Sequence, residues 1–415
     1  MIWLHLSNIV QLVQLTGIPR TEYEIFTFFS EKKEISNIIK FCTYDPKQGF
    51  VELTQDQIFE IKNYYQSKVI ENSNTNKLIS TTPKGTFSIV KRLCSSISKR
   101  LHTLQIFLNR IKYPFKKNDI YISTGLNIKS KAFRELKIIK QQVSLNINIF
   151  CYDIIPLTHP SLVKEENQTL FYNYMLSSAQ VADRFFCNSY YVKKQLVNFL
   201  RIQDLHVPSI EVVPLGCQLI NKIQSKNFIS QWKDLIEQPF MLYVSTIEIR
   251  KNHQILYQAY LELMKRNIPN LPKLIFIGRK GWMVDSFLSQ LDNDIGIKNK
   301  ILAIENVSDS ELIYFYKNSI FTLFPSFVEG YGLPVAESLA FGKYCLAANT
   351  SSLPEVGKNF IDYVDPNDAK AWADKIEYLL TNPEYLVSKE NFIKSNYNPI
   401  LWADAAQNIF SKISY

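Results

Sequence analysis

The chain has 415 residues, of which 46% are hydrophobic and 20% charged, and this balance suits a globular protein long enough for two domains. With 12 glycines and 17 prolines, the composition excludes a collagen-like or linker-dominated chain. The formal net charge is +9, and no run of roughly 18 apolar residues lacks charged or strongly polar side chains, so we expect no transmembrane helix.

The first half of the chain alternates short apolar runs with longer helical patterns, which is typical of βαβ units around a parallel sheet. The amino-terminal run has no basic flank and no small-residue cleavage site, so it indicates a first strand and loop, not a signal peptide. The candidate strands here are Ile2–Leu6, Asn37–Cys42, Ile120–Thr124, Asn146–Tyr152 and Arg184–Cys187.

A basic segment, residues 84–117, interrupts this series and contains no acidic residue. Its leucines and isoleucines recur at helical spacing between Leu93 and Leu108. A basic amphipathic helix favours contact with an anionic membrane surface, whereas the alternative is a solvated helix that packs on its own domain. Nucleic acid is not expected as a partner, because no recognised binding motif accompanies the charge.

The second half repeats the alternation, with candidate strands Phe240–Ser245, Lys273–Ile277, Ile320–Phe324, Tyr344–Ala347 and Ile361–Val364. A polar stretch, residues 217–238, separates the two series. We therefore predict an α/β protein with domains at residues 1–216 and 217–395. Six cysteines occur singly, which favours neither a zinc site nor a disulfide framework and fits a cytoplasmic protein.

The strongest motif is the segment from Phe324 to Glu337, which reads FPSFVEGYGLPVAE. A buried strand is expected to end near Phe324, and Pro334 indicates the start of a helix. Glycines in the loop allow close approach of backbone to a ligand, and the free N–H groups of a helix start attract phosphate. Because Glu329 and Glu337 flank this turn, the pattern suits a diphosphate ligand that carries hydroxyl groups on both sides.

This segment resembles the E-x7-E motif of retaining GT-B glycosyltransferases, especially family 4. The stretch from Tyr243 to His253, YVSTIEIRKNH, resembles the element in which that family carries its phosphate-binding cations. The resemblance implies two facing Rossmann-like domains, with the acceptor on residues 1–216 and the nucleotide sugar on residues 217–395. It also implies that residues 396–415 return as a helix to the first domain.

The resemblance assigns residues to the reaction. Arg250 and Lys251 would neutralise the leaving diphosphate, Glu329 would hold sugar hydroxyls, and Glu337 would hold the ribose. Many family members have a histidine before the aspartate of the acceptor loop, but here Tyr152 takes that place, so we assign the acceptor side to Asp153, with His159 as the alternative. The expected donor-binding residues are Gly17, Gly278, Val307, Gly330, Tyr331, Gly332, Leu333 and Glu337.

The implied reaction is retaining transfer of a hexose without a metal or other cofactor. A GDP-mannose-like donor is the first expectation and a UDP-sugar the second, with a lipid-linked or lipopolysaccharide-type glycan as acceptor at the inner membrane face. The alternatives are another GT-B enzyme, such as an epimerase, and a non-catalytic nucleotide- or glycan-binding protein. The triplet Asp292-Asn293-Asp294 could suggest a metal site, but its composition is more typical of a helix-terminating turn.

Overall fold

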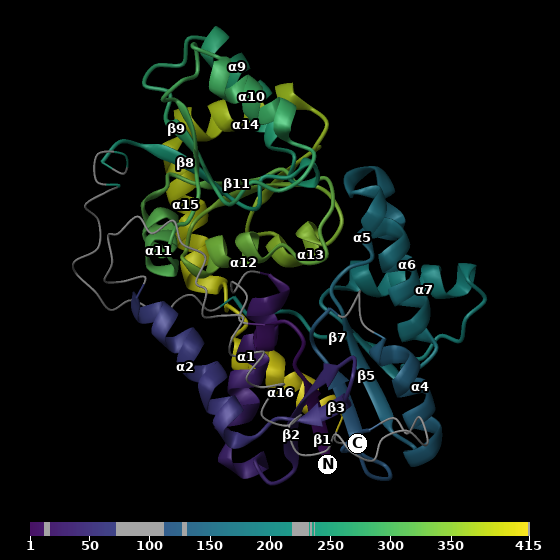
Figure 1. Ribbon diagram of the computed structural model, residues 1–415. Helices are drawn as coiled ribbons and strands as arrows, with labels where there is room; N and C mark the ends of the chain where they lie inside the picture. The colour runs from purple at the N-terminus through teal and green to yellow at the C-terminus, as the bar shows by residue number, and fades with distance from the viewer. Residues whose placement is uncertain are drawn as a thin grey trace.

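The computed structural model describes residues 1–11, 17–71, 112–126, 131–217, 232, 235 and 237–413. They form two lobes, each built around an open, mostly parallel sheet with helices on both faces (Figure 1). Of the basic segment 84–117, only residues 112–117 are among those described, so the expected amphipathic helix lies outside them. Within the described ranges, no helix is both long and apolar enough to cross a bilayer.

The amino-terminal lobe contains a seven-stranded sheet in the order β3-β2-β1-β4-β5-β6-β7, in which β3 is antiparallel to β2 and the other pairs are parallel. Its strands are β1 (Ile2–His5), β2 (Ile39–Asp45), β3 (Gly49–Glu52), β4 (Ile120–Ser123), β5 (Asn146–Cys151), β6 (Arg184–Cys187) and β7 (Ser209–Val212). Its helices are α1 (Ile18–Glu31), α2 (Gln55–Glu71), α4 (Ala132–Val143), α5 (Ile155–Thr158), α6 (Glu165–Ala179) and α7 (Tyr190–Ile202), with 3-10 turns η1 (Ile9–Gln11), η2 (Lys33–Ile35) and η3 (Pro160–Leu162).

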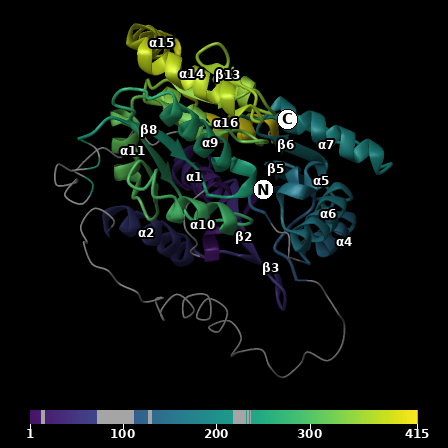
Figure 2. The ribbon, with the colours of Figure 1, turned by 90° about the horizontal axis from the view of Figure 1, so that it is seen from above.

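This sheet packs against apolar side chains on both faces. Successive side chains of a strand point to opposite sides, so neighbouring residues of one strand enter different core clusters. In β1, Leu4 belongs to a core cluster with side chains of α1 and of the last helix, while Trp3 belongs to a cluster with α4 and α6. Figure 2 shows α4 and α6 together on one side of the molecule. Because neighbouring strands β2, β1, β4, β5, β6 and β7 are parallel, their carboxyl ends lie along one edge of the sheet.

The carboxy-terminal lobe contains a six-stranded parallel sheet in the order β10-β9-β8-β11-β12-β13. Its strands are β8 (Phe240–Val244), β9 (Lys273–Ile277), β10 (Ile301–Ile304), β11 (Thr322–Phe324), β12 (Cys345–Ala348) and β13 (Asp362–Val364). Its helices are α9 (His253–Lys265), α10 (Asp285–Asn293), α11 (Asp309–Asn318), α12 (Leu333–Ala340), α13 (Leu353–Gly357), α14 (Ala369–Thr381) and α15 (Pro383–Asn396), with the 3-10 turn η5 (Ile249–Lys251).

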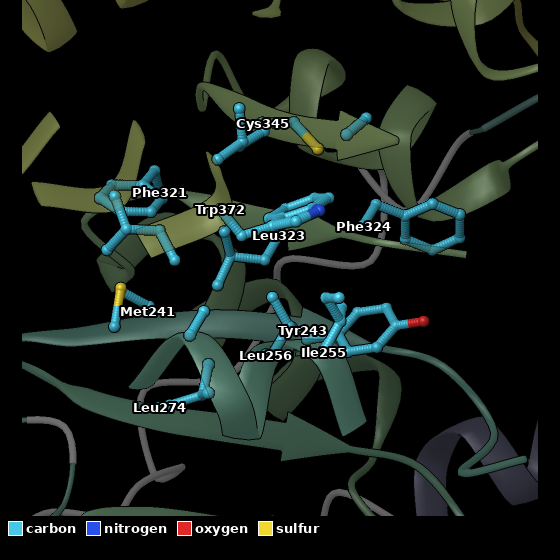
Figure 3. Close-up of a cluster of buried hydrophobic side chains, with 14 of the residues drawn as sticks. Met241, Tyr243, Ile255, Leu256, Leu274, Phe321, Leu323, Phe324, Cys345 and Trp372 are labelled. Atoms are coloured by element: carbon cyan, nitrogen blue, oxygen red, sulfur yellow. The ribbon is translucent and has the colours of Figure 1, made fainter. Parts of the chain in front are cut away.

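The core of this lobe lies between the sheet and helices α9 and α14, and its largest fully buried side chain is that of Trp372 (Figure 3). Tyr243 is part of the same cluster, but its hydroxyl group points away from the labelled aliphatic side chains. That hydroxyl donates a hydrogen bond of 2.6 Å to the carbonyl oxygen of Lys251. A buried tyrosine needs such a partner, and this bond ties the core to the loop that carries the predicted cations.

The chain crosses between the lobes twice, at neighbouring places. Leu215 packs in the amino-terminal core and Cys217 in the carboxy-terminal core, so the first crossing falls at Gly216. The second precedes helix α16 (Trp402–Ile413), which lies beside α1 and buries Trp402 in the amino-terminal core (Figure 1). A Cβ on Gly216 would lie 2.5 Å from the Trp402 backbone nitrogen, so the two crossings touch where only glycine fits.

The sequence patterns located the central strands well but missed β3, β7 and β10. Strand β3 is a four-residue edge strand reached by a tight hairpin, and β10 has only its two terminal residues buried. Short strands at or near a sheet edge bury few side chains, so their composition resembles that of loops.

Candidate active site

The loop after β8 carries the two predicted cations in the turn η5, Ile249–Lys251. Asn252 ends this turn with a φ of 58°, a left-handed conformation that asparagine tolerates better than most residues. Its side-chain amide donates to the carbonyl oxygens of Pro325 (3.1 Å) and Pro366 (2.7 Å). The asparagine therefore anchors the cation loop to the loop that follows β11.

The loop after β11 carries Glu329 and leads to helix α12. Gly332 caps this helix with a φ of 105°, which strongly favours glycine, and a Cβ there would lie 2.6 Å from Cδ2 of Leu353. The sequence predicts that Pro334 is the first residue of this helix. The helix begins at Leu333, so Pro334 is its second residue. Helix α12 lies near α1 of the amino-terminal lobe (Figure 1), and its first residue, Leu333, packs against the core of that lobe.

The two loops meet in a buried ion-pair cluster. One oxygen of Glu329 accepts a hydrogen bond of 2.5 Å from Nζ of Lys251, and the other accepts one of 2.8 Å from Arg250. The side chains of Glu329, Arg250 and Lys251 are 8%, 15% and 12% exposed. The structure therefore brings these three predicted residues together at the carboxyl ends of adjacent strands β8 and β11.

The charges in this cluster shift one another's protonation equilibria. Burial raises the pKa of Glu329, but the charges of Arg250 and Lys251 outweigh this effect and hold it at about 2. Burial and the neighbouring Arg250 lower the pKa of Lys251, although Glu329 opposes them. The sequence predicts that Glu329 holds sugar hydroxyls. Both of its oxygens contact the cations, so a hydroxyl would share their remaining lone pairs.

Glu248 is a member of the cluster that the sequence analysis missed. Its side chain is 2% exposed, and its Oε1 lies 2.7 Å from Nη2 of Arg250, whereas Glu329 contacts Nη1. The guanidinium group is thus held between two carboxylates, and burial raises the pKa of Glu248. The position of Glu248 two residues before Arg250 was the only sequence signal for this contact.

Asp153 belongs to the amino-terminal lobe, just after β5, and lies near the same cluster. Its Oδ1 accepts the backbone N–H of Ile155 at 3.0 Å, which orients the carboxylate at the start of α5. Burial raises its pKa, while the charge of Arg250 opposes that shift. Gly330 of the carboxy-terminal lobe packs against Tyr152, the residue before Asp153. A Cβ on Gly330 would lie 2.2 Å from the carbonyl oxygen of Tyr152.

Glu337 forms a second polar group at the lobe interface. Its carboxylate accepts a hydrogen bond of 2.8 Å from the hydroxyl group of Tyr316, and burial raises its pKa. Arg20, at the start of α1 in the other lobe, exerts an attractive charge on it and forms hydrogen bonds of 2.7 and 2.9 Å with Asp309. The E-x7-E pair therefore places one glutamate beside the cations and the other beside an interlobe ion pair.

The remaining predicted donor-binding residues occupy several environments. Gly17 caps α1, and Gly278 follows β9 with its backbone against the carbonyl group of Ser245. Val307 packs on the core beside α11. Leu333 packs against the amino-terminal core, whereas Tyr331 contacts both cores and donates a hydrogen bond of 3.1 Å to the carbonyl oxygen of Leu215.

Two further sequence features lie apart from the cluster. The side chain of His159 contacts the hydroxyl group of Thr158 at 2.9 Å. Asp294 ends helix α10 and accepts hydrogen bonds from Tyr257 and from the N–H of Gly296, as expected for a turn. In the described part of the chain, no three histidine, cysteine, aspartate or glutamate side chains are placed to hold a metal ion together.

The lobe that carries Arg250 and Lys251 is similar to a known protein family. Residues 225–398 match the family described as glycosyl transferases group 1. This part of the chain is therefore similar to the group 1 glycosyltransferases. Both predicted cations and both glutamates of the E-x7-E motif lie inside it.

Two curated mannosyltransferases are similar to part of the chain. O-antigen chain mannosyltransferase B of Escherichia coli is 36% identical over 143 residues, which are 34% of this chain and 37% of the relative. The serotype-specific mannosyltransferase WbdA of Escherichia coli is 27% identical over 236 residues, 54% of this chain and 28% of the relative. The chain thus spans about a third of the length of these relatives.

Solved structures match the whole chain. HepE of Anabaena, in complex with UDP, superposes with a TM-score of 0.59 at 13% identity, covering 100% of this chain and 99% of that one. Sucrose-phosphate synthase of Thermosynechococcus elongatus gives a TM-score of 0.60 at 14% identity, with coverage of 100% and 98%. At such low identity the likeness concerns the fold, and the predicted GT-B architecture of two parallel-sheet lobes is confirmed.

Proposed function

We propose that this protein transfers a hexose from a nucleotide sugar to a glycan acceptor with retention of the anomeric configuration. The observation that carries the proposal is the buried cluster of Arg250, Lys251 and Glu329 at the lobe interface, next to the start of α12. Two cations and the free N–H groups of a helix start suit a diphosphate.

The proposed chemistry follows from where charge develops. When the bond between the anomeric carbon and the diphosphate oxygen breaks, the bonding electrons move to the phosphate and the sugar becomes electron-poor. Arg250, Lys251 and the amides near Gly332 and Leu333 stabilise the leaving group, and they accelerate the reaction to the extent that they bind the transition state more tightly than the ground state. In this proposal the two side chains supply the positive charge, so no metal is required.

The other roles are divided between the lobes. Glu329 orients the sugar, Glu337 binds the ribose, and Asp153 lies on the acceptor side. Following the family resemblance, the acceptor hydroxyl attacks the anomeric carbon from the same face of the sugar from which the diphosphate leaves. The raised pKa of Asp153 suits a group that contacts an acceptor proton, because a more basic carboxylate is a better proton acceptor.

The donor in the proposal is GDP-mannose or a related GDP-sugar, with a UDP-sugar as the second candidate. The first choice is supported by the mannosyltransferases among the curated relatives, and the second by the UDP bound in the structural neighbour HepE. The proposed acceptor is a lipid-linked or lipopolysaccharide-type glycan, reached from the cytoplasmic face of the membrane. The names of the O-antigen relatives support this acceptor class.

The competing proposal is a non-catalytic GT-B protein that only binds a nucleotide or glycan, and one experiment separates the two. Thermal unfolding is followed with GDP, UDP and their sugars in the presence of a chelator, because a ligand that binds the folded state raises the melting temperature. The same samples are then incubated with a lipid-linked glycan extract, and free nucleotide is detected by mass. Stabilisation with nucleotide release supports transfer, and stabilisation without release supports nucleotide binding alone. No stabilisation by any nucleotide contradicts both transfer and nucleotide binding.

A further inference from the structure

Three consecutive carbonyl groups of the Glu329 loop are held by serine hydroxyls. Ser352 donates to the carbonyl oxygens of Glu329 (3.0 Å) and Tyr331 (2.9 Å). The carbonyl oxygen between them, that of Gly330, accepts a hydrogen bond of 2.7 Å from Ser189. Ser352 belongs to the same lobe as the loop, but Ser189 belongs to the other lobe. The backbone beside the predicted catalytic glutamate is therefore fixed from both sides of the interface.

Ser189 is also the cap of helix α7. Its hydroxyl oxygen accepts the N–H of Val192 at 3.1 Å, while its proton is donated to Gly330. A serine hydroxyl can accept and donate at once, so one side chain both starts the helix and contacts the other lobe. Ser189 is 2% exposed, so water competes little for either bond.

The same end of α7 binds a carboxylate from the other lobe. The two oxygens of Glu355, on α13, accept the backbone N–H groups of Tyr190 (2.7 Å) and Tyr191 (2.6 Å). These are the first two residues of α7, whose N–H groups have no partner within the helix. A negative charge at this position is also favoured by the helix dipole.

Glu355 is connected to Glu329 by a short path. Glu355 lies three residues after Ser352 in the sequence. The residue before Ser352, Ser351, accepts a hydrogen bond of 2.8 Å from the backbone N–H of Glu329 with its hydroxyl oxygen. Movement of α7 relative to α13 would therefore disturb the hydrogen bonds on both sides of the Glu329 peptide. We call the contacts of Ser189 and Glu355 across the interface the α7 clamp.

We propose that Glu355 and Ser189 are positioning residues, and that the α7 clamp couples closure of the two lobes to the placement of Glu329 against Arg250 and Lys251. The proposal rests on the proposed glycosyl transfer and adds two residues whose hydrogen bonds join the two lobes. In the closed arrangement the clamp brings the Glu329 loop against Tyr152 and Asp153, so donor-side and acceptor-side groups meet only when it forms.

The test uses two variants, each of which alters the hydrogen bonds of one clamp residue. Glu355→Gln keeps the size of the side chain but replaces one acceptor oxygen by an amino group that faces a backbone N–H. Ser189→Asp keeps an acceptor that can cap α7 but has no proton to donate to Gly330 at neutral pH. The matched control is Glu384→Gln, which changes an exposed glutamate in the first turn of α15.

Two readouts are compared. Each clamp variant is expected to lower kcat by about tenfold, the loss that corresponds to about one hydrogen bond, with the Kd for the nucleotide changed less than about twofold. The double variant should lose little more than either single variant, because both act on one contact. Small-angle X-ray scattering should show a larger radius of gyration for the variants than for the wild type and the control.

The outcomes separate the clamp from the proposed function. Unchanged kcat and unchanged scattering in Glu355→Gln and Ser189→Asp would overturn the clamp, and additive losses in the double variant would contradict a shared contact. A parallel fall in melting temperature and in the amount of active enzyme, with normal kcat per folded molecule, would show a merely structural role. If the wild type transfers no sugar, the proposed function fails, and the scattering comparison alone decides whether the clamp holds the lobes together.

Discussion

The ammonium nitrogen of Lys251 lies 2.5 Å from a carboxylate oxygen of Glu329, although 78 residues separate the two in the sequence. Their strands, β8 and β11, are neighbours in the sheet, so the loops that follow them begin side by side. Buried charges are tolerated only when they are paired, and this pair holds both side chains in place before any donor arrives. Such preorganisation is what electrostatic catalysis requires.

Replacing Lys251 by alanine tests its proposed role in stabilising the leaving diphosphate. We expect kcat to fall about a hundredfold, the order seen when one preorganised electrostatic donor is lost. Steady-state release of nucleotide from the preferred donor measures the effect, and Lys265→Ala, an exposed lysine at the end of α9, is the control. Normal kcat in a folded Lys251→Ala protein would remove this residue from the mechanism.

Gly330→Ala tests the contact between the lobes. The new methyl group would lie 2.2 Å from the carbonyl oxygen of Tyr152, so the backbones must separate. Because the Glu329 loop then leaves the acceptor-side lobe, we expect activity to fall more than about a hundredfold, as misplacement of reacting groups by about 1 Å can cause. Nucleotide binding, measured by calorimetry, should persist.

Gly296→Ala is the control for that variant, because the new methyl group would approach only Oδ1 of Asp294, at 3.1 Å, and no backbone atom. Equal activities of Gly330→Ala and Gly296→Ala would mean that the close approach at Tyr152 has no part in the reaction.

The sequence could predict those contacts between side chains that follow from the order of the strands. Arg250, Lys251 and Glu329 could be predicted to meet, because loops at the carboxyl ends of parallel strands share one edge. The contacts of Glu248, Ser189 and Glu355 could not, since they depend on how loops fold back and how two lobes pack. Tyr331 illustrates the limit: it sits inside the recognised motif, yet its hydroxyl group contacts Leu215 at the crossing between lobes.

Glu337→Gln tests the proposed ribose contact. A neutral amide is a weaker acceptor for hydroxyl groups than a carboxylate, and the loss applies equally to ground state and transition state. We therefore expect KM for the donor to rise about tenfold with kcat changed less than about twofold, in contrast to Lys251→Ala. A large fall in kcat with unchanged KM would instead place Glu337 at the reacting bond.

The pKa of Glu329 predicts a pH-dependent contribution to stability. Because the folded state lowers this pKa from 4.5 to about 2, the ionised carboxylate stabilises the folded protein above about pH 4.5, and this stabilisation is lost as the pH falls toward 2. Its upper size is about 3 kcal/mol, from roughly 1.4 kcal/mol for each pKa unit. We expect Glu329→Gln to unfold at lower denaturant concentration than the wild type at pH 7.

The difference between Glu329→Gln and the wild type should shrink as the pH is lowered from about 4.5 toward 2, because the unfolded chain takes up a proton on Glu329 in this range while the folded protein still resists protonation. Comparing the variant with the wild type at each pH cancels the opposite tendency of Glu337, whose pKa is raised by burial. A difference that stays constant over this range would contradict the lowered pKa.

The most direct test of the central claim is a crystal structure of the protein with the nucleoside diphosphate that stabilises it most. We predict that the terminal phosphate lies within hydrogen-bonding distance of Arg250 and Lys251 and of the first backbone N–H groups of α12, with the ribose at Glu337. A diphosphate bound elsewhere, with Arg250 and Lys251 still paired only to carboxylates, would contradict the account.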